Sequence, residues 1–235
     1  GSIRRIAFSS IAYRLYGFKS VKLKVGWGEE RDVALVRMAR KMLGRVTDIR
    51  VDANGAWDTS SALKTVPRLG DLGISSVEEP LSPECRADLP MLRTKVDVPI
   101  ILDESVSSPA QLKHAIDTGS CDLVNIRLSK CGGFFASLQM ARALHDNGLG
   151  YQLGCQVGET GILSAAGRHF AFLVPEIRHL EGSYDRHLLG ANLVDGDLTF
   201  GYGGWAPALD GMGLGVAVNR GRLEEYTVKK IEFSA

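Results

Sequence analysis

The sequence predicts an α/β protein, a (β/α)8 TIM-type barrel that is modified or truncated at its first βα unit and ends in an irregular, extended tail. Short apolar runs alternate with longer amphipathic stretches through most of the 235 residues, as in repeated βαβ units around a parallel sheet. Seven of these runs close on a polar residue, and the closing residues are spaced 24 to 28 positions apart. An open, doubly wound sheet is the alternative, but it rarely places a polar residue at the end of every strand.

The predicted elements follow in chain order. Strands are expected over 3–8, 20–25, 48–52, 74–79, 99–103, 121–127, 149–155 and 176–181. Apolar residues at helical spacing predict helices over 29–43, 58–73, 108–120 and 132–148. The second of these helices begins at Asp58, a capping residue, and contains Pro67, which should kink it. Only 11 residues separate Phe8 from Ser20, close to the minimum for a helical crossover, so the first unit is expected to be truncated.

The domain boundary is expected near residue 189. Residues 1–189 hold the repeated pattern, whereas 190–235 include the glycine-rich stretch "GDLTFGYGGWAPALDGMGLGV" (196–216). Such a composition favours turns and short extended pieces over a further βα unit. We therefore expect a barrel domain followed by a tail that packs against another part of the protein.

Composition narrows the classes of partner. A formal net charge of +1, with 45% hydrophobic residues, argues against nucleic acid or an anionic membrane as the main partner. The apolar runs fall well short of the roughly 18 residues that span a bilayer. The four cysteines show no C-x-x-C spacing, so we expect reduced thiols in a cytoplasmic protein.

Three acids end successive predicted strands: Asp52 in "RVDANG", Glu78 in "VEEP" and Asp103 in "ILDES". Neighbouring parallel strands lie about 4.8 Å apart, so these carboxylates can converge at the barrel mouth. Converging carboxylates would repel one another without a cation, and an all-oxygen set favours Mg²⁺. A single strand-end acid is equally well explained as a cap, but three at one period indicate a metal site.

Two lysines share one face of the strand "VKLKVG". Side chains at i and i+2 of a strand point the same way, so Lys22 and Lys24 should oppose Val21, Leu23 and Val25. Burial and cationic neighbours lower the pKa of a lysine until it can accept a proton. We interpret Lys24 as a general base and Lys22 as the neighbour that lowers its pKa and contacts substrate. The alternative is that both lysines extend to a wet rim.

The motifs "VKLKVG", "VDANGAW", "VEEP", "DES" and "NIRLSKCGG" resemble the enolase superfamily, and specifically its muconate lactonizing enzyme subgroup. The resemblance runs from about residue 17 to 218, with 153–169 and 207–216 similar to the family's last barrel strands and tail. It implies a Mg²⁺ enzyme, with Mn²⁺ as the alternative ion, that removes the proton α to a carboxylate of a small substrate and stabilises the enediolate. By position, Asp52, Glu78 and Asp103 match the family's metal ligands and Lys24 matches its base.

Two further residues are candidates for substrate contact. Asn54 follows the first acid in "VDANG", and Glu159 lies in "GET" after the predicted strand at 149–155. For Glu159 the alternative is an acid that stabilises a helix N-terminus.

The chain departs from the family at the end of the strand over 121–127. There the family normally carries a second catalytic lysine, and this sequence has Arg127. Arginine stays protonated at neutral pH, so a two-base racemase is disfavoured. Arg127 could instead bind a substrate carboxylate or steady the enediolate. Lys130, three residues later, is the alternative second base.

As a second departure, we expect this chain to lack the N-terminal capping domain that the family resemblance implies. An uncapped site would be open to water, and the tail would lose its packing partner, which favours a homo-oligomer. We expect one-base chemistry, as in a lyase, a dehydratase or a cycloisomerase. The alternative is a catalytically incompetent barrel fragment or scaffold. A sugar- or phosphate-binding barrel is less favoured because the glycine-rich phosphate loops are lacking.

Overall fold

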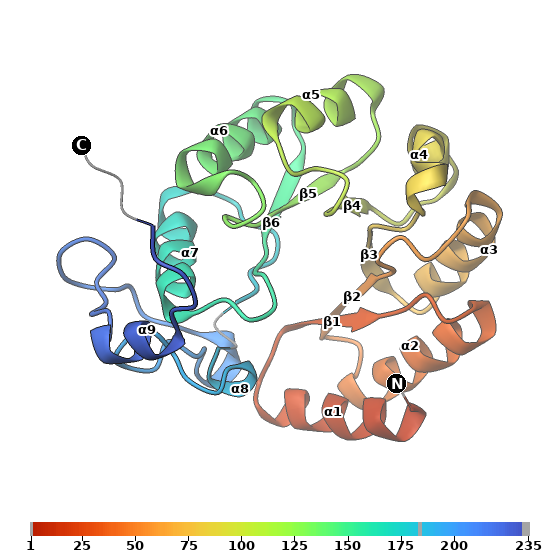
Figure 1. Ribbon diagram of the computed structural model, residues 1–235. Coiled ribbons are helices and arrows are strands. Elements are labelled where there is room, and N and C mark those ends of the chain that lie inside the picture. The colour runs from red at the N-terminus through yellow and green to blue at the C-terminus, as the bar shows by residue number, and fades with distance from the viewer. Residues whose placement is uncertain (1, 183–184, 232–235) are drawn as a thin grey trace.

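Six parallel strands curl into the inner wall of an open barrel, and helices cover their outer face (Figure 1). The computed structural model describes residues 2–182 and 185–231. The strand order β1-β2-β3-β4-β5-β6 follows the chain, as expected when each strand is followed by a crossover that returns beside it. The α/β class and the parallel sheet predicted from the sequence are therefore confirmed.

The bounds of the elements agree closely with the repeated pattern. The strands are β1 (Ser20–Lys24), β2 (Asp48–Asp52), β3 (Ile74–Glu78), β4 (Ile100–Leu102), β5 (Leu123–Ile126) and β6 (Gly150–Leu153). The helices are α1 (Ile3–Leu15), α2 (Glu29–Leu43), α3 (Thr59–Gly70), α4 (Leu89–Lys95), α5 (Pro109–Thr118), α6 (Gly133–Asp146), α7 (Gly161–Leu173), α8 (Asp185–Leu188) and α9 (Arg220–Tyr226), with short 3-10 turns η1 (Pro83–Asp88) and η2 (Tyr202–Gly204).

Local chemistry explains where the predicted helices begin. The Asp58 side chain accepts a hydrogen bond from the backbone N–H of Ser61 at the start of α3, and Ser108 caps α5 through the N–H of Gln111. These caps satisfy N–H groups that have no partner inside the helix. α5 ends at Gly119, whose φ of 66° is the left-handed conformation that glycine adopts without strain.

The predicted strand over 3–8 is wrong, because these residues open helix α1. Ser2 caps the helix by accepting a hydrogen bond from the N–H of Arg5, and α1 packs against α2 with Ser10 buried. A short apolar run does not distinguish strand from helix, and tertiary packing decides. The eight-strand count is therefore not met by the described residues, and α1 precedes the first βα unit, which consists of β1 and α2. The region 161–169, likened to the family's last strands, is likewise helical in α7.

The predicted strand over 176–181 forms in part. Residues 178–181 extend along β6, with a parallel bridge between Leu153 and Leu180. Glu181 N–H donates to Leu153 O and Leu153 N–H donates to His179 O. This segment continues the curl of the sheet beyond β6 toward β1.

The C-terminal tail folds back on the barrel. Val194 and Leu198 are buried with Ala165 of α7 in a small second core, and Arg168 Nη2 of α7 donates to Leu198 O at 2.6 Å. Further along, Gly203 N–H donates to Tyr16 O at the end of α1. The tail thus lies over the side of the barrel where the sheet is not closed, and the expected lack of a capping domain stays a prediction.

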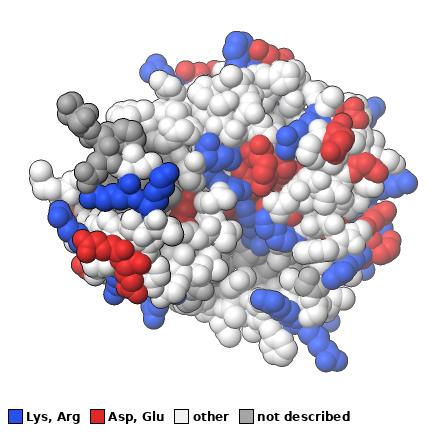
Figure 2. Space-filling view, in the orientation of Figure 1, with Lys and Arg blue, Asp and Glu red and all other residues white. Residues whose placement is uncertain are grey.

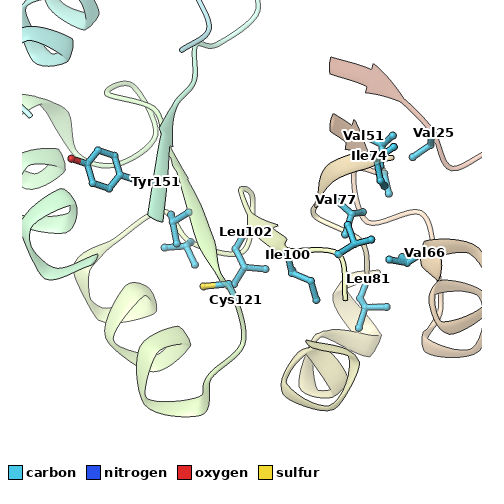
Figure 3. Close-up of a cluster of buried hydrophobic side chains, with 14 of the residues drawn as sticks. Val25, Val51, Val66, Ile74, Val77, Leu81, Ile100, Leu102, Cys121 and Tyr151 are labelled. Carbon is cyan, nitrogen blue, oxygen red and sulfur yellow. The ribbon is translucent and has the colours of Figure 1, made fainter. Parts of the chain in front are cut away.

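The main core lies between the sheet and the surrounding helices. Figure 3 shows strand side chains such as Val77 and Ile100 packed toward Val66 of α3 and Leu81, all of them fully or almost fully buried. Burial of this apolar surface holds the strands in register and so fixes where their carboxyl ends lie. None of the described helices is long and apolar enough to cross a membrane.

Candidate active site

The carboxyl ends of the strands bring charged side chains together at one end of the barrel. β1 pairs with β2 so that Lys24 is opposite Asp52, and β2 pairs with β3 so that Asp52 is opposite Glu78. Figure 2 shows acidic and basic side chains gathered near the middle of the face that overlies the ring of strands. The register of the sheet therefore places Lys24, Asp52 and Glu78 on neighbouring strands.

Lys24 lies at the rim of this cluster. Its side chain is 54% exposed, whereas that of Asp52 is fully buried. Lys24 Nζ donates to Asp52 Oδ2 and to Asn54 Oδ1, each at 2.7 Å. Its aliphatic stem thus leaves the strand on the inner face and presents the amine to the barrel mouth, where an incoming molecule can reach it.

Lys22 lies deeper, on the same face of β1. Its Nζ is 2.8 Å from Glu181, 3.2 Å from Glu78 and 3.5 Å from Asp52. Burial by itself would lower the pKa of Lys22, but the three carboxylates outweigh burial and raise the pKa above its ordinary value. Lys22 is therefore a fixed internal cation, and this geometry does not favour the role of a base.

A polar layer lies beneath the strand ends. Glu78, fully buried, accepts hydrogen bonds from Asn125 Nδ2 and Gln152 Nε2, each at 2.9 Å. Arg50 donates to Gln152 Oε1 at 2.9 Å and to Glu181 Oε1 at 2.6 Å. Burial would raise the pKa of Glu181, but Lys22 and Arg50 together hold it below its ordinary value. This layer fixes the orientation of the Glu78 carboxylate.

Asp103 is paired with the residue that breaks the family pattern. Arg127 follows β5 directly, and its guanidinium forms an ion pair with the buried Asp103 carboxylate. Arg127 Nη1 also donates to Gln156 Oε1 at 3.0 Å, and Nη2 lies 3.6 Å from Glu104 Oε1. Burial, followed by the charges of Glu79, Asp52 and Glu78, raises the pKa of Glu104.

Lys130 is held by the backbone. Its Nζ donates to the carbonyl oxygens of Asp103, Val106 and Asn125 at 2.5 to 2.9 Å, and lies 2.9 Å from Asp103 Oδ1. Burial lowers the pKa of Lys130 to about 8. The ammonium ties the loop after β4 to the end of β5, which favours an anchoring role over that of a second base.

The two candidate substrate contacts are both engaged within the protein. Asn54 has φ of 46°, and its side chain accepts from Lys24 and donates to Glu104 Oε1 at 3.3 Å. Glu159 Oε1 accepts from the N–H of Gln156 and from Ser129 Oγ. Asn54 therefore contacts the candidate base directly, whereas Glu159 braces the loop that carries Gln156.

Within residues 2–182 and 185–231, no three His, Cys, Asp or Glu side chains lie in an arrangement that could hold a metal ion. The chemistry of Asp52, Glu78 and Asp103 nevertheless fits a hard divalent cation, since all three are fully buried oxygen donors. Both carboxylate oxygens of Asp103 are buried, and the side chains beside them are those of Arg127 and Lys130. Cations of the chain itself balance the three carboxylates in this structure. The oxygen donors fit Mg²⁺ by their chemistry, although they do not form a metal-binding arrangement here.

A cavity of about 600 Å³ opens beside Lys24. Its walls carry Lys22 and Arg50 on the side of the sheet. Apolar walls come from Phe18 after α1, Leu180 in the segment along β6, and Phe200 in the tail. This combination of cations and apolar surface suits a small anionic molecule with an apolar part.

Three participants escaped the sequence reasoning: Arg50, Gln152 and Glu104. The first two had a readable signal, because each lies on the inward face of its strand, and Arg50 stands two positions before the strand-end Asp52. Glu104 lies in the quoted motif "DES" and could have been tested as a partner of Arg127. Glu181 was recognised as a strand end but not as part of the site.

Comparison with known proteins agrees with this geometry. Residues 8–222 match the family model described as Enolase C-terminal domain-like. The N-succinyl-L-Arg/Lys racemase of Bacillus cereus is 34% identical over 66% of this chain and 42% of its own length. Muconate cycloisomerase 1 of Rhodococcus opacus is 31% identical over 88% of this chain and 56% of its own length.

A solved structure extends the likeness to three dimensions. The dipeptide epimerase of Cytophaga hutchinsonii, complexed with Mg and the dipeptide D-Ala-L-Val, superposes with a TM-score of 0.89 at 27% identity, covering 96% of this chain and 61% of that chain. The chain thus spans about two fifths to three fifths of the length of these relatives. With its ordered strand-end motifs and its barrel topology, the chain belongs to the Enolase C-terminal domain-like family, in the muconate lactonizing enzyme-like subgroup of the enolase superfamily.

Proposed function

We propose that the chain carries the site of a Mg²⁺-assisted enzyme in which Lys24 removes the proton α to the carboxylate of a small substrate. The observation that carries the proposal is the position of the Lys24 amine, half-exposed at the barrel mouth and 2.7 Å from the buried carboxylate of Asp52. A base needs access to the substrate and a fixed direction of approach. Asp52 and Asn54 supply the direction, and the adjoining cavity supplies the access.

Asp52, Glu78 and Asp103 would hold the metal ion. When bound, the ion supplies positive charge that stabilises the negative charge developing on the substrate carboxylate. The buried layer of Asn125, Gln152 and Lys22 keeps Glu78 oriented for this purpose. Mn²⁺, with similar oxygen preference, is the alternative ion.

Arg127 limits the proposed chemistry to a single base, on one face of the substrate α-carbon. A two-base isomerase needs a proton acceptor on each face of the α-carbon, and arginine does not give up its proton at neutral pH. Relatives named above are a racemase, an epimerase and a cycloisomerase, so inversion is the outcome to test against. We favour a one-base outcome, namely elimination, dehydration or cycloisomerisation.

The test follows the α-proton itself. The protein would be incubated with Mg²⁺ in D₂O with both enantiomers of N-succinyl amino acids and of simple dipeptides, and loss of the α-proton signal would be measured by NMR. We expect deuterium to enter one enantiomer with retention of configuration, since only one face has a base. Lys24→Met should abolish the exchange, whereas Lys113→Met, on the exposed face of α5, should leave it unchanged.

Two results would contradict the proposal in different ways. Exchange that survives in Lys24→Met would remove Lys24 from the role of base. Inversion of configuration by the wild-type protein would overturn the one-base reading and return Lys130 to consideration. Arg127→Lys provides the complementary check, because a new lysine at this position should allow exchange in both enantiomers.

A second function is favoured by one observation. The carboxylates of Asp52, Glu78 and Asp103 are each paired with a cation of the chain itself, which is also what a catalytically silent barrel or scaffold would show. Calorimetric titration with Mg²⁺ separates the two, because a scaffold of this kind would bind no ion.

A further inference from the structure

The carboxylate of Asp103 differs from the other two acids in how it is satisfied. Asp52 accepts hydrogen bonds from Lys24 and from the N–H of Asn54, and Glu78 accepts from two side-chain amides. Both oxygens of Asp103 are buried, and the side chains next to them are cations rather than amides. Its balancing charges are Arg127 and Lys130, and of these Lys130 is fixed by three carbonyl groups.

Arg127 is held less completely than Lys130. Its Nε is buried without a partner among the described residues, and one of its amino groups donates to Gln156 in the loop after β6. A second carboxylate, Glu104, lies 3.6 Å from Nη2 with its side chain 43% exposed. The Arg127 guanidinium therefore lies between the buried Asp103 and the more exposed Glu104, which is the next residue in the sequence.

We propose that Arg127 is an internal competitor of the metal ion at Asp103. The guanidinium neutralises Asp103 while the ion is absent, and it shifts toward Glu104 when Asp103 becomes a ligand. This inference rests on the proposed function, because it concerns the same site. The physical reason is that Asp103 cannot be close to both a guanidinium and a divalent cation without strong repulsion between the two cations.

The competition has a measurable consequence for metal affinity. Arg127→Met removes the charge while filling similar space. Mg²⁺ then no longer has to displace a guanidinium from Asp103 in order to bind. We expect at least tenfold tighter Mg²⁺ binding by Arg127→Met than by the wild-type chain. The matched control is Arg86→Met, since Arg86 lies 3.3 Å from Glu79 and is 38% exposed, but does not contact the three acids.

The experiment is a calorimetric titration of the metal-free chain with MgCl₂, with the Mg²⁺-induced rise in melting temperature as a second readout. Circular dichroism of each variant checks that it is folded. Asp103→Asn should abolish binding in both the wild-type and the Arg127→Met backgrounds. Glu104→Gln should weaken binding more in the wild-type background than in Arg127→Met, because the displaced guanidinium then lacks its second partner.

Each outcome decides between the claims. Equal affinity of wild type and Arg127→Met, with Asp103→Asn still abolishing binding, would overturn the competition and leave the proposed function intact. Tightening of the same size in Arg86→Met would overturn it as well, in favour of a general effect of net charge. No Mg²⁺ binding by the wild type, Arg127→Met or Arg86→Met would overturn the proposed function and this inference with it.

Discussion

Lys22 and Glu181 form an ion pair of 2.8 Å that joins the two ends of the curled sheet. Lys22 lies on β1, the first strand, and Glu181 lies on the segment that extends along β6. Among the described residues no strand pairing links that segment to β1. Arg50 of β2 contacts the same carboxylate oxygen at 2.6 Å. Side-chain charge thus closes the barrel at a place where the backbone ladder stops.

Glu181→Gln should therefore destabilise the fold. The substitution keeps the shape but leaves Lys22 and Arg50 without the carboxylate that they share. Removing one partner of a buried pair costs about 3–5 kcal/mol, and the 16% exposure of Glu181 reduces the expected loss to roughly 2–4 kcal/mol. Urea unfolding gives the free energy directly. A control is Glu30→Gln, whose side chain is 83% exposed in its pair with Arg68 and whose loss should be barely measurable.

Substitutions of Lys24 and Lys22 should affect α-proton exchange and folding stability differently. Lys24→Met should lower α-proton exchange by about 10²- to 10⁴-fold, the usual contribution of a general base, while the unfolding free energy changes by at most about 1 kcal/mol because its ion pair is half-exposed. Lys22→Met should lower both, since it removes the cation that Asp52, Glu78 and Glu181 share. Exchange rates and urea midpoints measured on the same preparations give the comparison. Equal loss of stability in the two variants would contradict the view that Lys22 is a buried structural cation and Lys24 a half-exposed one.

Lys130→Met tests the anchoring role against the role of second base. Loss of the ammonium leaves three backbone carbonyls and Asp103 without their donor, so we expect a loss of roughly 3–5 kcal/mol in unfolding free energy. Lys113→Met is the control, because its ion pair with Asp117 is exposed on α5 and is worth about 0.5 kcal/mol. If the wild-type protein inverts substrate, a Lys130→Met protein that is as stable as wild type yet no longer inverts would favour the catalytic role instead.

Much of the barrel was predictable because its repeat is local. Each strand needs a short apolar run and each helix a periodic face, and both can be read from a single sequence. α2 was predicted over the residues that form it, and the strand-end positions Lys24, Asp52 and Glu78 close their observed strands. The start of the chain was misread, since residues 3–8 fit a strand as well as a helix until α2 supplies a packing surface.

The pairing of charged residues in the site could not be predicted from the spacing of residues along the chain. The sequence placed Lys22 beside Lys24 and so predicted that it lowers the pKa of its neighbour. Its three acidic partners come from β2, β3 and the segment after α7, up to 159 positions away in the chain. Arg127 was identified as a departure from the family pattern, but its pairing with Asp103 depends on the approach of two loops that no local pattern encodes.

His179 offers a separate test of the buried polar layer through pH. It lies on the segment that extends along β6, 6% exposed, with Nδ1 3.4 Å from Asp48 Oδ2. Burial first, and then the charge of Arg50, lowers the pKa of His179 to about 4, although Asp48 opposes the shift. The folded protein therefore holds this imidazole neutral at a pH where the unfolded chain binds a proton.

The sign of the pH effect follows from that difference. The unfolded state takes up a proton near pH 6.5 and the folded state near pH 4, so the stability associated with His179 is fully present above pH 6.5 and is lost as the pH falls toward 4. The loss should reach at most roughly 3 kcal/mol. Because carboxylates titrate in the same range, the measurement is the difference in urea unfolding free energy between wild type and His179→Gln at pH 7.5 and 4.5. The His179→Gln variant should lose less stability on acidification than wild type. His114→Gln, a substitution at an exposed residue of α5, should lose as much as wild type. An equal loss of unfolding free energy in all three proteins would show that His179 is protonated in the folded state.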